Sequence, residues 1–92
     1  MRIEWTRPAI RDIREAADFI ASDNPGAAAR MAERVTEAVE WLPDQPNIGR
    51  PGRVPGTREL VVSGTPFLVV YRVRGAAVQI LRLLHHARKW PA

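Results

Sequence analysis

The apolar residues of this chain change their spacing once, at a segment rich in proline and glycine that spans residues 43–56. Before this segment they recur every three or four residues, as in an amphipathic helix, and after it they alternate, as in a strand. No hydrophobic period survives within the segment, because proline and glycine interrupt both patterns. The chain is therefore restricted to a largely helical first part and a β second part, joined by a loop.

Two helices are expected between about residues 7 and 42. Thr6 and Asn24 are suitable N-cap residues, and each is followed closely by a proline that fits a first helical turn. The apolar positions lie on one side of each helix: Ile10, Ile13, Ala17 and Ile20 in the first, and Ala28, Met31, Ala32, Val35, Val39 and Leu42 in the second. The short connection predicts an antiparallel helix hairpin.

The second part predicts a meander of three strands within residues 57–85. Apolar residues cover 60–62, 67–73 and 77–85, and turn residues occupy 63–66 and 74–75. Ile3 and Trp5 alternate with charged residues, so a further short strand should join the edge of the sheet. The predicted fold class is α+β, in the order β-α-α-β-β-β, with an antiparallel sheet and the helix hairpin packed on one face.

A chain of 92 residues fits a single domain, 1–92, and a core this small gains from a stabilising partner. Cysteine is absent, which excludes disulfides and cysteine-ligated metals. His85 and His86 are neighbours on a strand and point to opposite faces, so we expect neither a metal nor a cofactor. We find no signal peptide and no apolar run that spans a membrane, which predicts a cytoplasmic protein without a membrane partner.

Positive charge is concentrated in the second half of the chain. Residues 1–46 carry six arginines and nine acidic residues, a net charge of −3, whereas residues 47–92 carry eight basic residues and one acid, a net charge of +7. Thirteen of the 14 cations are arginine, which suits bidentate contacts with phosphate or carboxylate, although a high genomic G+C content also enriches arginine. The balance favours a polyanion or an acidic protein as partner.

The strand over residues 67–73 is apolar on both faces. Leu68 and Val70 share one face with Arg72 and Arg74. Two helices cover only one side of a sheet, so these four residues are expected to form an exposed, arginine-ringed surface for another protein, unless the sheet curls over part of it.

Several short motifs, in their order and spacing, resemble the ParE/RelE toxin family over nearly the whole chain. They are Asn24-Pro25-Gly26-Ala27-Ala28, Gly49-Arg50-Pro51-Gly52-Arg53, Gly56-Thr57-Arg58-Glu59-Leu60-Val61, Tyr71-Arg72-Val73 and the run from Ile80 to Trp90. Each is weak alone, and together they are rather specific.

The resemblance implies a growth-inhibiting toxin of a type II toxin-antitoxin pair, held in a hetero-oligomeric complex by a ParD/RelB-like antitoxin with an acidic and apolar tail. The Leu68, Val70, Arg72 and Arg74 surface is then the expected antitoxin site. ParE-like members poison DNA gyrase, whereas RelE-like members are metal-independent endoribonucleases that cleave messenger RNA on the ribosome. Either target remains open for this chain.

A ribonuclease needs a base for the 2′-hydroxyl, cations for the phosphorane and an acid for the leaving oxygen. His85, Arg82, Glu59 and Arg58 are the candidates. Strand parity places Arg82 and His85 on opposite faces unless a bulge intervenes. The loop lysines of RelE-type nucleases are also missing, with only Arg50 and Arg53 in that region, and arginine is a poor proton donor.

Most of these residues also have an ordinary structural interpretation. Glu59 is expected to pair with Arg58 or Arg72, His85 to end a strand with a satisfied hydrogen bond, and Tyr71 to lie in the core. Residues 86–92 form a basic tail. The residues expected to contact the target or phosphate lie both before this tail and within it: Arg50, Arg53, Arg58, Arg72, Arg82, Arg88, Lys89 and Trp90. The gyrase-directed interpretation stands slightly ahead of the endoribonuclease, and a non-toxic nucleic-acid-binding module is the third.

Overall fold

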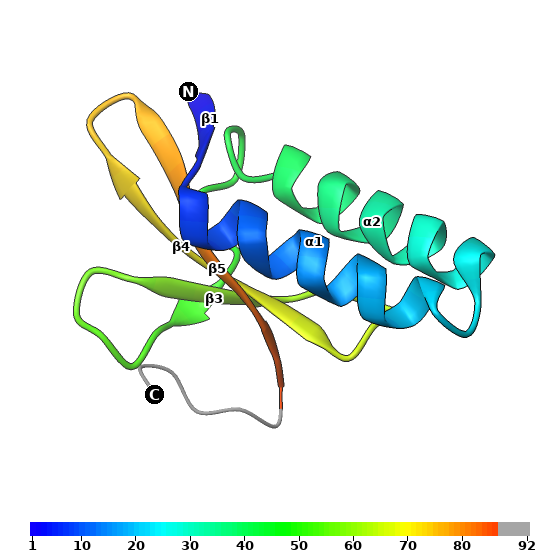
Figure 1. The fold of residues 1–92 in the computed structure, drawn as a ribbon. Helices are drawn as coiled ribbons and strands as arrows, with labels where there is room; N and C mark the ends of the chain where they lie inside the picture. Colours follow the sequence, from blue (N-terminus) through cyan, green and yellow to red (C-terminus); the bar gives the residue numbers. More distant parts are fainter. Residues whose placement is uncertain (87–92) are drawn as a thin grey trace.

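The computed structural model describes residues 1–86, in which two helices lie side by side across one face of a five-stranded sheet (Figure 1). The helices are α1 (Arg7–Ala21) and α2 (Pro25–Glu40). The strands are β1 (Arg2–Trp5), β2 (Arg50–Pro51), β3 (Arg58–Val61), β4 (Phe67–Arg74) and β5 (Ala77–His85). The predicted α+β class, with a helix hairpin on one sheet face, is confirmed.

Both helices begin at the expected caps. The side chain of Thr6 accepts a hydrogen bond from the Ala9 N–H, and that of Asn24 accepts one from the Ala27 N–H. Each cap satisfies a backbone donor that has no partner inside the helix. Thr6 also donates its hydroxyl to the carbonyls of Ile80 and Leu81, so the start of α1 is attached to β5.

The sheet order is β1-β5-β4-β3-β2, which differs from a purely antiparallel meander in two details. β1 runs parallel to β5, whereas an antiparallel sheet was predicted. β2 pairs for two residues with β3, inside the segment predicted as a loop, with Arg50 opposite Glu59. The antiparallel meander of β3, β4 and β5 is as predicted.

A bulge interrupts the pairing of β4 with β5. Val70 lies opposite Arg82 and Tyr71 lies opposite Ile80, so Leu81 is the extra residue of β5. An extra residue changes which face the following side chains point to. The faces of residues 82–85 are therefore reversed relative to those of residues 77–80, whereas the predicted alternation from Arg82 to His85 is unbroken.

The main core lies between the helices and the sheet. It combines the apolar side of α2 with the inward-facing residues of β4 and β5: Met31, Val35, Val39, Leu42, Val69, Tyr71, Val78, Ile80 and Leu83 are buried there together. In residues 1–86, no helix is long and apolar enough to cross a membrane, and no group of three His, Asp or Glu side chains could hold a metal ion.

Candidate functional site

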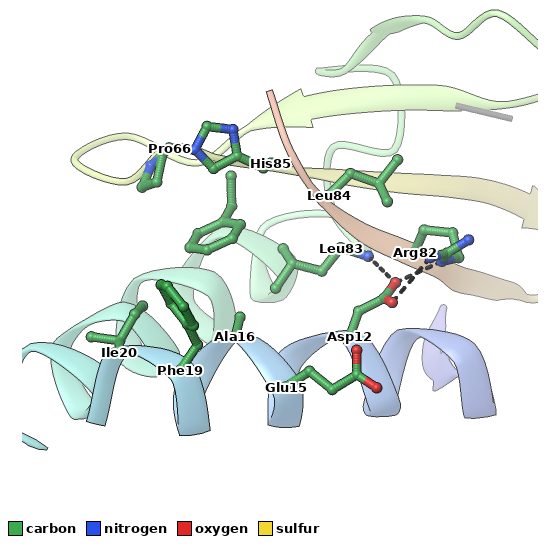
Figure 2. Close-up of a pocket in the computed structure, with 11 residues that line it drawn as sticks. Asp12, Glu15, Ala16, Phe19, Ile20, Pro66, Arg82, Leu83, Leu84 and His85 are labelled. Atoms are coloured by element: carbon green, nitrogen blue, oxygen red, sulfur yellow. Dashed lines mark hydrogen bonds and ion pairs between the residues drawn. The ribbon is translucent and has the colours of Figure 1, made fainter. Parts of the chain in front are cut away.

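A pocket of about 480 Å³ opens between α1 and the C-terminal half of β5 (Figure 2). It forms because β1 pairs with β5 only as far as Ile80, which leaves the rest of β5 without an outer strand. The pocket has polar groups at one end and apolar ones at the other. Its lining comprises Asp12, Glu15, Ala16, Phe19, Ile20, Pro66, Phe67, Arg82, Leu83, Leu84 and His85.

Asp12 holds the polar end of this pocket together. Its carboxylate accepts hydrogen bonds from Arg82 Nε at 2.7 Å and Nη2 at 3.1 Å, and a third from the Leu83 N–H at 3.0 Å. The third bond satisfies a backbone donor on the unpaired edge of β5. Hydrogen bonding to Asp12 also raises the pKa of Arg82 above its ordinary value, so this guanidinium stays charged and oriented towards α1.

His85 lies at the other end of the same pocket. Its ring packs edge-on against Phe67, with centroids 6.0 Å apart, and the residue is exposed. Arg82 and His85 thus line opposite ends of one pocket, while the alternation from Arg82 to His85 is unbroken, because the bulge at Leu81 precedes both residues. Phe19 borders it as well, with 81% of its surface exposed.

Glu59 and Arg58, the other two nuclease candidates, lie outside the lining of this pocket. Glu59 forms an ion pair with Arg50 at 3.1 Å, whereas Arg58 or Arg72 was the expected partner. The cause is β2, which places Arg50 directly opposite Glu59. Arg58 donates instead to the Gly49 carbonyl at 2.8 Å.

Tyr71 fastens the Gly/Pro segment to the sheet and is fully buried, as predicted. Its hydroxyl accepts a hydrogen bond from the Gly49 N–H at 2.9 Å and donates one to the Pro46 carbonyl at 2.8 Å. Burial raises the pKa of Tyr71 above 10.0, which keeps the hydroxyl protonated as a donor. The segment is thereby held in one shape, with Arg50 and Arg53 exposed on it.

The sheet face turned away from the helices differs from the exposed apolar surface that was expected. Leu68 and Val70 are buried, with exposed fractions of 6% and 0%, in a second small cluster with Leu84. Leu81, the extra residue of the bulge, packs against this cluster, so the bulge contributes to covering side chains that regular pairing would leave more exposed. Of the four residues proposed for this surface, Arg72 and Arg74 remain at least partly exposed.

Arg72 is held in place on this face by a chain of hydrogen bonds. Its Nε donates to Gln79 Oε1 at 2.7 Å, and Gln79 Nε2 donates to Glu4 Oε1 at 3.1 Å. The bond from Gln79 is the main cause that lowers the pKa of Glu4. Arg88, Lys89 and Trp90, which were predicted to contact the target, lie outside the described residues.

The interpretation of the sequence missed two residues that line the pocket, Asp12 and Phe19. A detectable signal existed for Asp12, because it lies three residues after Ala9 and four before Ala16, on the buried side of α1. An acid at such a position needs a partner. Phe19 lies outside the regular apolar side of its helix, and a large exposed apolar residue of this kind is typical of an interaction site.

The fold is that of a class of small toxins from type II toxin-antitoxin systems. A chain of the solved structure titled "Chromosomal ParDE TA system from P. aeruginosa" superposes with a TM-score of 0.85 at 34% identity, and the match covers 92% of this chain and 95% of that one.

The model of the family described as "ParE toxin of type II toxin-antitoxin system, parDE" matches residues 3–90. The chain belongs to this family, and membership supports a protein antitoxin as its partner. Among similar curated proteins, "Putative toxin Y4kP" of Sinorhizobium fredii is 42% identical over 98% of this chain and 93% of its own length. "Toxin RelE2" of Caulobacter vibrioides is 37% identical over 95% and 97%.

Proposed function

We propose that this toxin arrests growth by acting on DNA gyrase, and that its antitoxin prevents this by covering the sheet face that carries Arg72 and Arg74. The proposal follows the ParE family to which the chain belongs. It accords with a surface on which arginines are presented from helices, strands and an anchored loop, and with a pocket in which Arg82 is already paired with Asp12.

The observation that carries the gyrase assignment is that three of the four nuclease candidates are bound by other groups, and that two of them, Glu59 and Arg58, lie outside the pocket of Arg82 and His85. Arg82 is bound by Asp12, Glu59 by Arg50, and the guanidinium of Arg58 by a backbone carbonyl. Cleavage of RNA needs its base, acid and cations around one phosphate. A toxin that acts by binding its target needs only a rigid, complementary surface.

The Gly/Pro segment is the part of that surface we propose to contact gyrase. Tyr71 and Arg58 hold its backbone at Gly49. The loop is therefore ordered before it binds, and it loses little further conformational entropy on binding. Arg53 is exposed and forms no ion pair within residues 1–86, whereas Arg50 is shared with Glu59. Arg53 is thus the loop cation best placed to reach a partner.

A supercoiling assay with purified gyrase and plasmid tests the assignment. We expect the toxin to stop supercoiling and to accumulate cleaved DNA, and premixed antitoxin to restore activity. Arg53→Glu should weaken inhibition, while Arg30→Glu, a matched change on the exposed side of α2, should not. Normal supercoiling at saturating toxin would eliminate the gyrase proposal, and normal growth of cells that express the chain would favour a non-toxic binding module.

Ribosome-dependent cleavage of messenger RNA is a second candidate, favoured by one observation. Arg82 and His85 line the same pocket between α1 and β5, at its opposite ends. This candidate requires position-specific cuts in translated messages that disappear in His85→Ala. Intact messages during growth arrest would remove it.

A further inference from the structure

Three arginines on α1 form a separate cationic surface, in the half of the chain whose net charge is negative. Arg7, Arg11 and Arg14 are all exposed, and their spacing of four and three residues places them on one side of the helix. A shallow hollow of about 410 Å³ runs along them, lined also by Ile10 and Glu15. We call these three residues the α1 arginine stripe.

The α1 arginine stripe has no bonding partner within residues 1–86. Ion pairs there join Arg2 to Glu4, Arg50 to Glu59 and Arg82 to Asp12, and none of the three stripe guanidiniums donates a hydrogen bond. Glu15 and Asp18 follow on the same helix, but an acid placed four residues after a base is the weaker orientation for pairing. Glu15 acts electrostatically on Arg82 as well. The stripe is therefore available to an external anion.

The stripe also does not stabilise its own helix. It occupies the first half of α1, where the helix dipole favours acids, and the first turn contains none. In addition, the three positive charges of the stripe lie on adjacent turns and repel each other. An intramolecular role is therefore a poor explanation for this arrangement.

The composition of the surface favours phosphate over a protein partner. A protein interface has an apolar or aromatic centre. The large apolar side chains exposed within residues 1–86 are Met1, Phe19, Trp41, Ile48, Val61 and Val73, and none lines the hollow. Guanidinium groups, in contrast, match phosphate through bidentate hydrogen bonds.

The geometry favours the backbone of duplex DNA in particular. Seven residues of helix extend about 10.5 Å, and phosphates along one DNA strand advance about 3.4 Å each, so the stripe spans roughly three of them. Single-stranded nucleic acid is usually held by aromatic stacking, and no aromatic side chain lines this hollow. We propose that Arg7, Arg11 and Arg14 form a contact site for the sugar-phosphate backbone of duplex DNA, without sequence preference.

This inference deepens the proposed function, because gyrase works while it holds duplex DNA, and the stripe would let the toxin contact both. It is tested on the whole chain without gyrase, so that the two proposals can fail separately. Binding of a fluorescent 20-base-pair duplex is followed by anisotropy over a range of salt concentrations. Each phosphate contact should contribute about 0.9 to the slope of log K against log salt.

We expect Arg11→Gln to reduce that slope by about 0.9 and the triple variant Arg7→Gln/Arg11→Gln/Arg14→Gln to reduce it by about 2.7. The control Arg30→Gln removes the same charge from an exposed position of α2 and should leave the slope unchanged. Circular dichroism checks that each variant is folded. If the triple variant unfolds, the comparison of Arg11→Gln with Arg30→Gln decides the matter.

Equal slopes for Arg11→Gln and Arg30→Gln would overturn the inference, because only the overall charge would then matter. So would unchanged DNA binding together with weaker antitoxin binding, which would make the stripe a protein contact. If the wild type binds DNA through the stripe but does not inhibit gyrase, the inference stands and the proposed function fails. If Arg11→Gln binds DNA like the wild type and the wild type still inhibits gyrase, the inference fails and the proposed function stands.

Discussion

At the scale of single residues, Asp12 decides the shape of the pocket between α1 and β5. One carboxylate binds the Arg82 guanidinium and the Leu83 N–H, and so attaches the helix to the unpaired edge of the strand (Figure 2). The side chain of Asp12 is only 13% exposed, so water cannot easily replace these bonds. Asp12 is therefore a positioning residue for Arg82.

We predict that Asp12→Asn lowers the free energy of unfolding by about 1–2 kcal/mol, because a charge-assisted pair becomes a neutral contact and one acceptor is lost. Asp18→Asn changes an exposed acid on the same helix and should alter stability by less than about 0.5 kcal/mol. Urea unfolding measures both. Equal effects of the two substitutions would show that the Asp12 contacts contribute no net stability.

Tyr71 belongs to the same scale, because a single hydroxyl satisfies two backbone groups of the Gly/Pro segment. Tyr71→Phe should lower the free energy of unfolding by about 1–3 kcal/mol, the usual effect of leaving buried polar groups without partners. The folded pKa of Tyr71 is raised above 10.0, so the folded state holds this proton more tightly than the unfolded state.

The stability linked to that proton is complete below pH 10 and is lost as the pH rises through the higher folded pKa. Wild type should thus lose stability relative to Tyr71→Phe as the pH rises above about 10, the ordinary tyrosine pKa. Urea titrations of both proteins at a series of pH values measure this difference. Parallel pH profiles would contradict it.

At the scale of elements, the segment over residues 43–56 is a fixed structure and not a flexible linker. Its glycine at position 49 is buried against the sheet, where a Cβ would lie 2.7 Å from the Tyr71 hydroxyl and 3.0 Å from the Glu59 carbonyl oxygen. No side chain fits there without moving β3 or Tyr71. The requirement for glycine is steric at this position.

Gly49→Ala should accordingly destabilise the protein by about 1–3 kcal/mol, as overpacking usually does, and should weaken the proposed inhibition of gyrase. Gly26→Ala is the matched control, because its Cβ would meet the flexible end of Arg30 at 3.2 Å and Asn24 Oδ1 at an ordinary contact distance of 3.5 Å, and alanine favours a helix. Thermal unfolding compares the two. A Gly49→Ala protein as stable as wild type would mean that the segment can shift at little cost.

At the scale of the whole molecule, the sheet face that we propose for the antitoxin is more polar than its sequence indicates. Leu68 and Val70 are buried, so the antitoxin would first meet the guanidiniums of Arg72 and Arg74. Arg72 is tied to Gln79, which leaves Arg74 as the cation that can be changed with least effect on the fold.

If an acidic antitoxin segment covers this face, Arg74→Glu should weaken the complex, mainly through slower association and a smaller salt dependence. An exposed charge pair contributes up to about 1 kcal/mol, or roughly fivefold in affinity. Surface plasmon resonance at two salt concentrations measures this against Arg30→Glu. Identical association rates for the two variants would exclude the face as the antitoxin site.

The sequence alone determined the parts of the fold that depend on local rules. The caps at Thr6 and Asn24, the apolar sides of both helices, the meander and the burial of Tyr71 all follow from periodicity and turn chemistry within a few residues. Family membership was also indicated by the sequence, because its motifs extend along nearly the whole chain.

Only the tertiary structure decided which distant residues meet. The parallel pairing of β1 with β5, the bulge at Leu81, and the bonds from Asp12 to Arg82 and from Glu59 to Arg50 all join segments far apart in the chain. A bulge of one residue reverses the face of every later side chain, and nothing in the local alternation of β5 reports it. The physical reason is that pairing and register are set by the packed sheet as a whole, whereas periodicity describes each strand separately.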